Sequence, residues 1–219
     1  MPPPPPRPPS CSIYLATPPL TAAAAPAFAR TFAEVLAAVP VASARVRFDP
    51  GAEAAAKAIV APLLAAAEKS GCALLLDGDP RRAARLGADG AHVEGAGEAL
   101  DEALESLKPE RIVGVGALRM RDDAMVAGEK GADYVMFGEP RGAHPAMALE
   151  LLVERVGWWA QIFETPCVAY AESADAAGRL AEAGADFVAL DEAIWGAPSP
   201  VEAARALHAT LSRVAAEAP

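Results

Sequence analysis

The stretch Gly131-Ala132-Asp133-Tyr134-Val135-Met136-Phe137 decides the fold, because it joins a glycine turn directly to a short apolar run. Glycine readily takes the left-handed backbone conformation that ends a helix, and a short apolar run bounded by turn residues is typical of a buried strand. The same Gly-Ala-Asp tripeptide occurs at residues 87–89 and 184–186, again between a helical segment and an apolar run. The three copies predict repeated helix-to-strand turns.

Working outward from these turns, short apolar runs alternate with alanine-rich segments of helical propensity along the whole chain. The predicted strands are residues 11–15, 41–48, 73–76, 90–93, 112–115, 134–137, 167–170 and 187–190. The predicted helices are residues 26–38, 52–69, 81–86, 98–107, 122–130, 147–162, 174–183 and 201–215. Eight predicted strands are more than the five or six that an open doubly wound sheet usually has. We therefore predict an α/β fold, a single (β/α)8 TIM barrel.

The domain organisation follows from where the alternation begins. Residues 1–10 contain seven prolines, a composition that favours an extended polyproline II conformation. We therefore expect a disordered proline-rich tail over residues 1–10 and one barrel over residues 11–219 of the 219-residue chain.

The net charge and the hydropathy of the chain restrict the classes of partner that it can bind. A formal net charge of -10, with no basic stripe to offset it, argues against nucleic acid. No apolar run is long enough to span a membrane and no signal peptide is evident, so we expect a soluble, cytoplasmic protein whose partner is a small-molecule ligand. Cys11, Cys72 and Cys167 lie in apolar runs and are interpreted as reduced core thiols.

The Gly-Ala-Asp turns also orient the barrel. They precede the strands, which places Asp89, Asp133 and Asp186 on the face of the barrel that serves stability. We interpret these aspartates as structural. Catalytic and binding groups are expected at the opposite, carboxyl ends of the strands.

Two arginines stand out at those ends. The alternation of the second strand puts Arg45 and Arg47 on one face, opposite Ala44 and Val46, so both guanidinium groups should point into the barrel mouth. A buried guanidinium cannot lose its charge and needs an anionic partner. Two alternatives are open: a phosphate or carboxylate ligand, or an internal ion pair with one of the nearby carboxylates Asp77, Asp79, Glu94 and Glu139.

His92 and Glu94 share one face of the fourth strand by the same alternation. An imidazole beside a carboxylate can transfer protons at neutral pH. The alternative is a core histidine that is hydrogen-bonded to a neighbouring carboxylate.

The chain resembles the thiamine phosphate synthase and thiazole tautomerase superfamily over nearly its whole length after Ser10. The similar segments are Ile13-Tyr14-Leu15-Ala16-Thr17-Pro18, Leu74-Leu75-Leu76-Asp77-Gly78-Asp79, Ala83-Ala84-Arg85-Leu86-Gly87-Ala88-Asp89-Gly90-Ala91-His92-Val93, Ile112-Val113-Gly114-Val115-Gly116 and Gly131-Ala132-Asp133-Tyr134-Val135-Met136-Phe137-Gly138. The resemblance implies a barrel in which thiazole phosphate displaces pyrophosphate from hydroxymethylpyrimidine pyrophosphate with the help of Mg²⁺.

Most of the family's catalytic motifs are degenerate in this chain. Where the family has glutamine, arginine and lysine in alternate positions, the chain has Arg45, Arg47 and Asp49, so only Arg47 matches. Asp77 and Gly78 replace an asparagine–aspartate pair, which leaves Asp79 as the candidate Mg²⁺ ligand. The family's serine is Gly116 here.

The remaining departures concern phosphate binding. Glu139 and Arg141 stand in the loop where the family has threonine and lysine, and Ala171-Glu172 replaces a pair of glycines. The predicted catalytic residues are His92, Arg47 and Glu94. The predicted substrate-binding residues are Arg45, Arg47, Asp77, Gly116, Glu139, Arg141 and Glu172.

Three functional hypotheses follow. The first is a divergent barrel that keeps the fold, has altered or lost synthase chemistry and binds a small anionic ligand at its carboxyl face. The second is an active thiamine phosphate synthase, a transferase, and the third is a tautomerase-like isomerase that uses His92 or His144. Adjacent Trp158 and Trp159 diverge on one helix, so one of them is a candidate homodimer contact.

Overall fold

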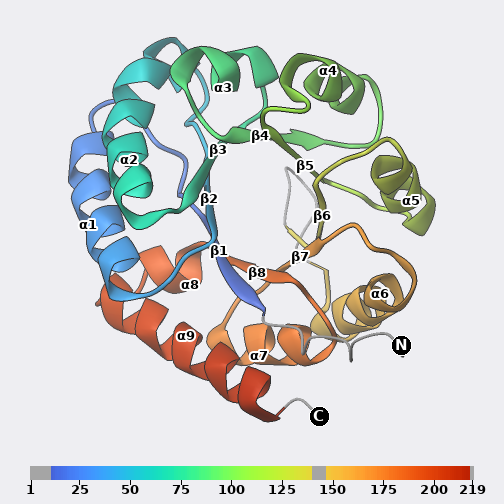
Figure 1. The fold of residues 1–219 in the computed structure, drawn as a ribbon. Helices are drawn as coiled ribbons and strands as arrows, with labels where there is room; N and C mark the ends of the chain where they lie inside the picture. Colours follow the sequence, from blue (N-terminus) through green and yellow to red (C-terminus); the bar gives the residue numbers. More distant parts are fainter. Residues whose placement is uncertain (1–10, 140–146, 218–219) are drawn as a thin grey trace, which may run out of the picture.

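Eight parallel strands close into a barrel in their order along the chain, with helices packed around the outside (Figure 1). The computed structural model describes residues 11–139 and 147–217. The strands are β1 Ser12–Ala16, β2 Ser43–Val46, β3 Ala73–Asp77, β4 Gly90–Glu94, β5 Ile112–Gly116, β6 Tyr134–Phe137, β7 Cys167–Tyr170 and β8 Phe187–Leu190. The predicted (β/α)8 TIM barrel is therefore confirmed.

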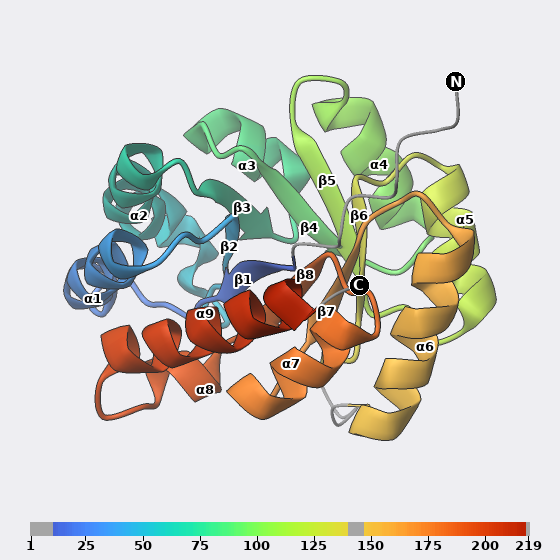
Figure 2. The ribbon, with the colours of Figure 1, turned by 60° about the horizontal axis from the view of Figure 1, so that its bottom comes forward.

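The helices follow the strands as predicted, with two additional short elements. They are α1 Ala25–Ala38, η1 Ala52–Ala55, α2 Ala56–Ser70, α3 Pro80–Leu86, α4 Glu98–Leu107, α5 Arg121–Glu129, α6 Leu149–Ile162, α7 Ala174–Glu182, α8 Glu192–Trp195 and α9 Pro200–Glu217. The 3-10 turn η1 takes the place of the predicted first turn of α2, and α8 was not predicted. Helix α9 packs against α1 and α7 and completes the helical ring (Figure 2).

The three aspartates of the Gly-Ala-Asp turns bind the backbone of the preceding strand, which confirms their structural interpretation. The carboxylate of Asp89 accepts from the N–H of Leu74 at 2.7 Å, and the N–H of Asp89 donates to the carbonyl of Leu74 at 2.9 Å. Asp133 makes the same two-point contact with Val113, and Asp186 with Cys167. The preceding glycines have φ values of 76°, 95° and 102°, in the left-handed region that favours glycine.

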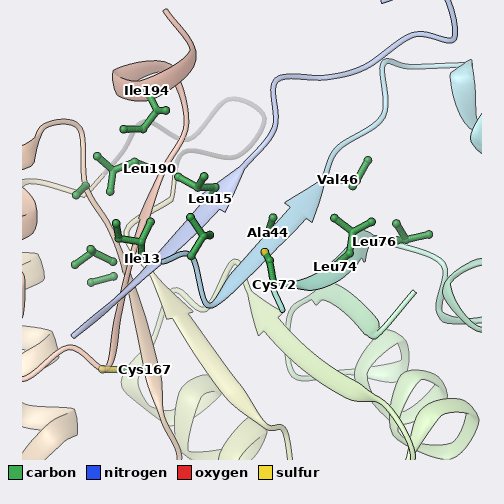
Figure 3. Close-up of a cluster of buried hydrophobic side chains, with 14 of the residues drawn as sticks. Ile13, Leu15, Ala44, Val46, Cys72, Leu74, Leu76, Cys167, Leu190 and Ile194 are labelled. Carbon is green, nitrogen blue, oxygen red and sulfur yellow. The ribbon is translucent and has the colours of Figure 1, made fainter. Parts of the chain in front are cut away.

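The barrel walls separate two apolar layers. Between strands and helices, alternate residues such as Ala44, Val46, Leu74 and Leu76 point outward into the larger layer (Figure 3). Inside the barrel lies a smaller cluster. Its members are Tyr14, Leu75, Tyr134, Met136, Val168 and Ala189. Since Arg45 lies between Ala44 and Val46, the alternation directs its side chain inward, as predicted.

Strand β2 is shorter than the predicted strand over residues 41–48. It ends at Val46, and Phe48 forms only an isolated parallel bridge with Leu20. The backbone N–H of Arg47 donates to the hydroxyl of Thr17 at 3.0 Å. Residues 47 and 48 therefore approach the chain that follows β1 and leave the regular ladder, which places Arg47 above the end of β1.

The three cysteines are free of disulfides, and Cys72 and Cys167 are buried while Cys11 is half-buried. Burial raises the pKa of each thiol to about 12. Within the described residues, no helix is long and apolar enough to cross a membrane. The predicted tail over residues 1–10 lies outside the described residues.

Candidate active site

Arg45 and Glu139 form the centre of the charged cluster at the barrel mouth. The Arg45 side chain is fully buried and that of Glu139 is 3% exposed. Arg45 Nη1 donates to Glu139 Oε2 at 3.1 Å, and Nη2 contacts Oε1, so the two groups pair through both of their terminal atoms. Asp77 Oδ1 lies 3.9 Å from Arg45 Nη1. A two-point guanidinium–carboxylate pair of this kind fixes the orientation of both groups.

Burial by itself would lower the pKa of Arg45, since it removes the charged guanidinium from water. The charges of Glu139, Tyr14 and Asp77 and the hydrogen bonds to Glu139 together outweigh this effect, and the pKa of Arg45 lies above its ordinary value. The charge of Arg45 is therefore retained inside the barrel because Glu139 neutralises it.

Arg47 has a different carboxylate partner. Its Nη2 donates to Asp191 Oδ2 at 2.8 Å and its Nε donates to the carbonyl oxygen of Thr17, while Nη1 lies 3.9 Å from Glu139 Oε1. Asp191 also accepts from the Tyr170 hydroxyl at 2.8 Å. Burial would raise the pKa of Asp191, but the hydrogen bonds from the Glu192 N–H and Tyr170 and the charge of Arg47 lower it below its usual range.

Both arginines form internal ion pairs in the structure, which is one of the two alternatives, and their binding of an anionic ligand stays a prediction. Asp77 and Glu139 were among the expected partners of Arg45, whereas the pairing of Arg47 with Asp191 was missed. Strand β1 pairs with both β2 and β8, so barrel closure brings the ends of these strands together. The sequence signal that could have found it is the position of Asp191, directly after the last strand of a closed barrel.

His92 lies inside the barrel and is fully buried. Its Nδ1 is 2.8 Å from the Tyr134 hydroxyl, which in turn is 2.9 Å from the Tyr14 hydroxyl. Glu94, at the end of β4, is exposed. His92 thus has the surroundings of a core histidine, with Tyr134 as a polar neighbour that the sequence analysis missed, and its part in proton transfer stays a prediction.

Asp79, the residue proposed as a Mg²⁺ ligand, does not sit in a site that fits that ion. Asp79 Oδ1 accepts from the N–H groups of Arg81 and Arg82 at 2.9 and 3.2 Å, so this carboxylate caps helix α3. Mg²⁺ takes near-octahedral oxygen ligands and is usually bound through carboxylates and waters. Nowhere in residues 11–139 and 147–217 do three Asp, Glu, His or Cys side chains gather as a metal site.

The other predicted binding residues are spread around the mouth. Gly116 is buried at the end of β5, beside His92, and Glu172 is exposed after β7. Arg141 and His144 lie outside the described residues. A cavity of about 340 Å³ opens beside Asp77, Asp79 and Glu94. The mouth is therefore rich in carboxylates, and both described arginines are already paired.

The family model for "Thiamine monophosphate synthase" matches residues 13–194, which include strands β2 to β8, all of β1 except Ser12, and the described mouth. The chain belongs to this family. Within the thiamine monophosphate synthase family, the chain is similar to the thiamine-phosphate synthase of Rhodospirillum centenum, with 38% identity over 89% of this chain and 94% of that protein. The thiamine-phosphate synthase of Hyphomonas neptunium is 34% identical over 94% of this chain and 96% of that protein.

Solved structures of other proteins have the same fold as this member of the thiamine monophosphate synthase family. Thiamine phosphate pyrophosphorylase from Pyrococcus furiosus superposes with a TM-score of 0.77 at 20% identity, covering 94% of this chain and 98% of that one. A 3-hexulose-6-phosphate synthase superposes with a TM-score of 0.70 at 19% identity, covering 91% and 99%. At such identities the likeness concerns the barrel alone.

Proposed function

We propose that this chain is a transferase that makes thiamine phosphate in the cytoplasm, by displacement of pyrophosphate from hydroxymethylpyrimidine pyrophosphate by thiazole phosphate. Relatives that are named thiamine-phosphate synthase support this proposal over 94% and 96% of their own lengths. The structural observation that carries it is the pair of inward-facing arginines, Arg45 and Arg47, at the mouth.

The reaction needs positive charge where pyrophosphate leaves, because the departing group accumulates negative charge in the transition state. Guanidinium groups suit this role, since they hold phosphate oxygens through two parallel hydrogen bonds. In the structure described here both arginines face carboxylates, so pyrophosphate must take over the contacts that Glu139 makes with them.

A second candidate function has its own supporting observation. Arg45 and Arg47 are already neutralised by Glu139 and Asp191, and exposed Glu172 adds further negative charge at the mouth. A barrel with these pairs would keep the family fold, lack the transfer reaction and bind another small ligand at the same face. A tautomerase-like activity gains no support from the described residues, because His92 is buried against Tyr134 and His144 lies outside them.

The two candidates differ in whether product forms. The purified protein is incubated with both substrates, with and without Mg²⁺, and thiamine phosphate and pyrophosphate are measured by chromatography. Transfer predicts both products in equal amounts and a loss of at least tenfold in Arg47→Ala. Arg205→Ala is the matched control, since this arginine pairs with Glu202 on the surface of α9.

The absence of product from folded protein, while the Rhodospirillum centenum relative is active in the same assay, would overturn the transferase proposal. Arg47 is preferred to Arg45 as the test because its side chain is 18% exposed and that of Arg45 is fully buried. Truncation of Arg45 would leave a buried carboxylate without its cation and would threaten folding itself.

A further inference from the structure

Glu139 occupies the space between the two arginines of the mouth. One of its oxygens, Oε1, contacts Arg45 Nη2 and lies 3.9 Å from Arg47 Nη1, while Oε2 accepts from Arg45 Nη1 at 3.1 Å. A single carboxylate is thus shared between two guanidinium groups. With 3% of its side chain exposed, Glu139 is nearly sealed from solvent in this position.

The geometry of this contact is the same geometry by which guanidinium groups bind the oxygens of a phosphate. We propose that Glu139 determines the specificity of the mouth, because its carboxylate fills the anion subsite that Arg45 and Arg47 would otherwise offer to a ligand. This inference rests on the proposed function, which requires a pyrophosphate group at those arginines. It adds that a residue of this chain, Glu139, places a negative charge where the pyrophosphate group would bind.

The backbone before Glu139 shows that the fold places this side chain. Gly138 has a φ of 87°, a conformation that favours glycine, and turns the chain immediately after β6. A β-carbon at position 138 would lie 2.6 Å from Leu152 Cδ2, so a larger residue would also force the buried Leu152 side chain to shift. Glu139 therefore enters the mouth from a turn that the surrounding structure fixes.

Arg45 supplies a second, independent observation. Its Nε is buried and has no hydrogen-bond partner within the described residues. Glu139 satisfies the terminal nitrogens of the guanidinium but leaves this donor unused. A buried donor without an acceptor is costly, and an oxyanion with more than two oxygens would bring an additional acceptor to the same group.

The balance of charges at the mouth also supports this proposal. Two guanidinium groups, those of Arg45 and Arg47, face three carboxylates, those of Asp77, Glu139 and Asp191. A pyrophosphate that entered beside Glu139 would meet like charges in a partly dry site, where they are screened weakly. Among these described groups, removal of the Glu139 charge leaves two guanidinium groups facing the two carboxylates of Asp77 and Asp191.

The test is calorimetric titration of inorganic pyrophosphate into the full-length protein and into Glu139→Gln and Glu139→Ala. We expect each variant to bind pyrophosphate at least tenfold more tightly than the wild type. The matched control is Glu164→Gln, which removes the same charge from an exposed position in the turn before β7. Its affinity should stay at the wild-type value.

Folded variants that bind pyrophosphate no better than the wild type would overturn the inference, as would an equal gain in Glu164→Gln. Glu139→Gln keeps the shape of the side chain and an oxygen that accepts from Arg45, so it tests the charge if Glu139→Ala does not fold. Because pyrophosphate alone is titrated, the result is separate from turnover. Tighter binding in the variants together with an inactive wild type would refute the transferase proposal only.

Discussion

Gly116 and His92 lie so close that a β-carbon at position 116 would fall 2.6 Å from His92 Nε2. Position 116 therefore has no room for a side chain beside the histidine ring. The Tyr134 hydroxyl contacts the other ring nitrogen, His92 Nδ1, and holds the ring in place. By the resemblance stated above, the family has a serine where this chain has Gly116. Here the space that its side chain would need is taken by an imidazole.

Restoring that serine should consequently destabilise the protein. Gly116→Ser forces the His92 ring or strand β5 to shift, and overpacking of a core typically costs about 1–3 kcal/mol. Gly97→Ser is the control, because a β-carbon at that helix N-cap meets nothing within 4 Å and serine is a favourable cap there. Urea denaturation measures both variants, and equal stability of the two would contradict the packing argument.

Asp191→Asn tests the ion pair at Arg47. The folded-state pKa of Asp191 is lowered, so protonation favours the unfolded chain. The stabilisation is present above the ordinary aspartate pKa of about 3.9 and is lost as the pH falls through the lower, folded value. We expect Asp191→Asn to lower the free energy of unfolding by about 1–3 kcal/mol at pH 7. As the pH falls, the stability of this variant should decline less than that of the wild type.

Unfolding free energies between pH 7 and pH 2 check this expectation. Glu202→Gln is the comparison, because its pair with Arg205 on α9 is exposed, and exposed pairs contribute about 0–1 kcal/mol. An acid profile that is identical in wild type and Asp191→Asn would refute the assigned role.

Tyr134→Phe should cost more stability than Tyr14→Phe. The Tyr134 hydroxyl contacts both His92 Nδ1 and the Tyr14 hydroxyl, whereas Tyr14→Phe leaves the His92–Tyr134 contact intact. An unpaired buried polar group costs about 1–3 kcal/mol, and Tyr134→Phe removes a hydrogen bond from two such groups. Denaturation of both variants tests the order, and imidazole nitrogen NMR should report a change at His92 only in Tyr134→Phe.

Asp186→Ala should destabilise the barrel by about 1–3 kcal/mol without changing ligand affinity at the mouth. Its carboxylate binds the Cys167 N–H at 2.8 Å at the amino end of β7, away from the arginines. Asp175→Ala, on the exposed first turn of α7, is the control and should cost about 0.3–1 kcal/mol. A loss of ligand binding by folded Asp186→Ala would show that this end of the barrel is not purely structural.

Sequence periodicity predicted the barrel because every strand is a local apolar run, and the inward direction of Arg45 because strand alternation is local as well. The partners at the mouth could not be predicted in the same way. Arg47 and Asp191 are 144 residues apart and meet only when β8 closes on β1. The sequence offers many carboxylates at the strand ends, and the three-dimensional arrangement selects Glu139 and Asp191 from among them.

The aspartate contacts at the base of the barrel span short stretches of chain, with separations of 15, 20 and 19 residues. Each fastens one strand to the next before any long-range pairing is needed, which favours rapid, stepwise assembly of strand–helix–strand units. Amide hydrogens at these bases should accordingly exchange last with solvent. A barrel whose assembly depends on the aspartate contacts at the amino ends of its strands can accept substitutions at the carboxyl ends without losing the fold. Members of one family can therefore differ extensively in their chemistry.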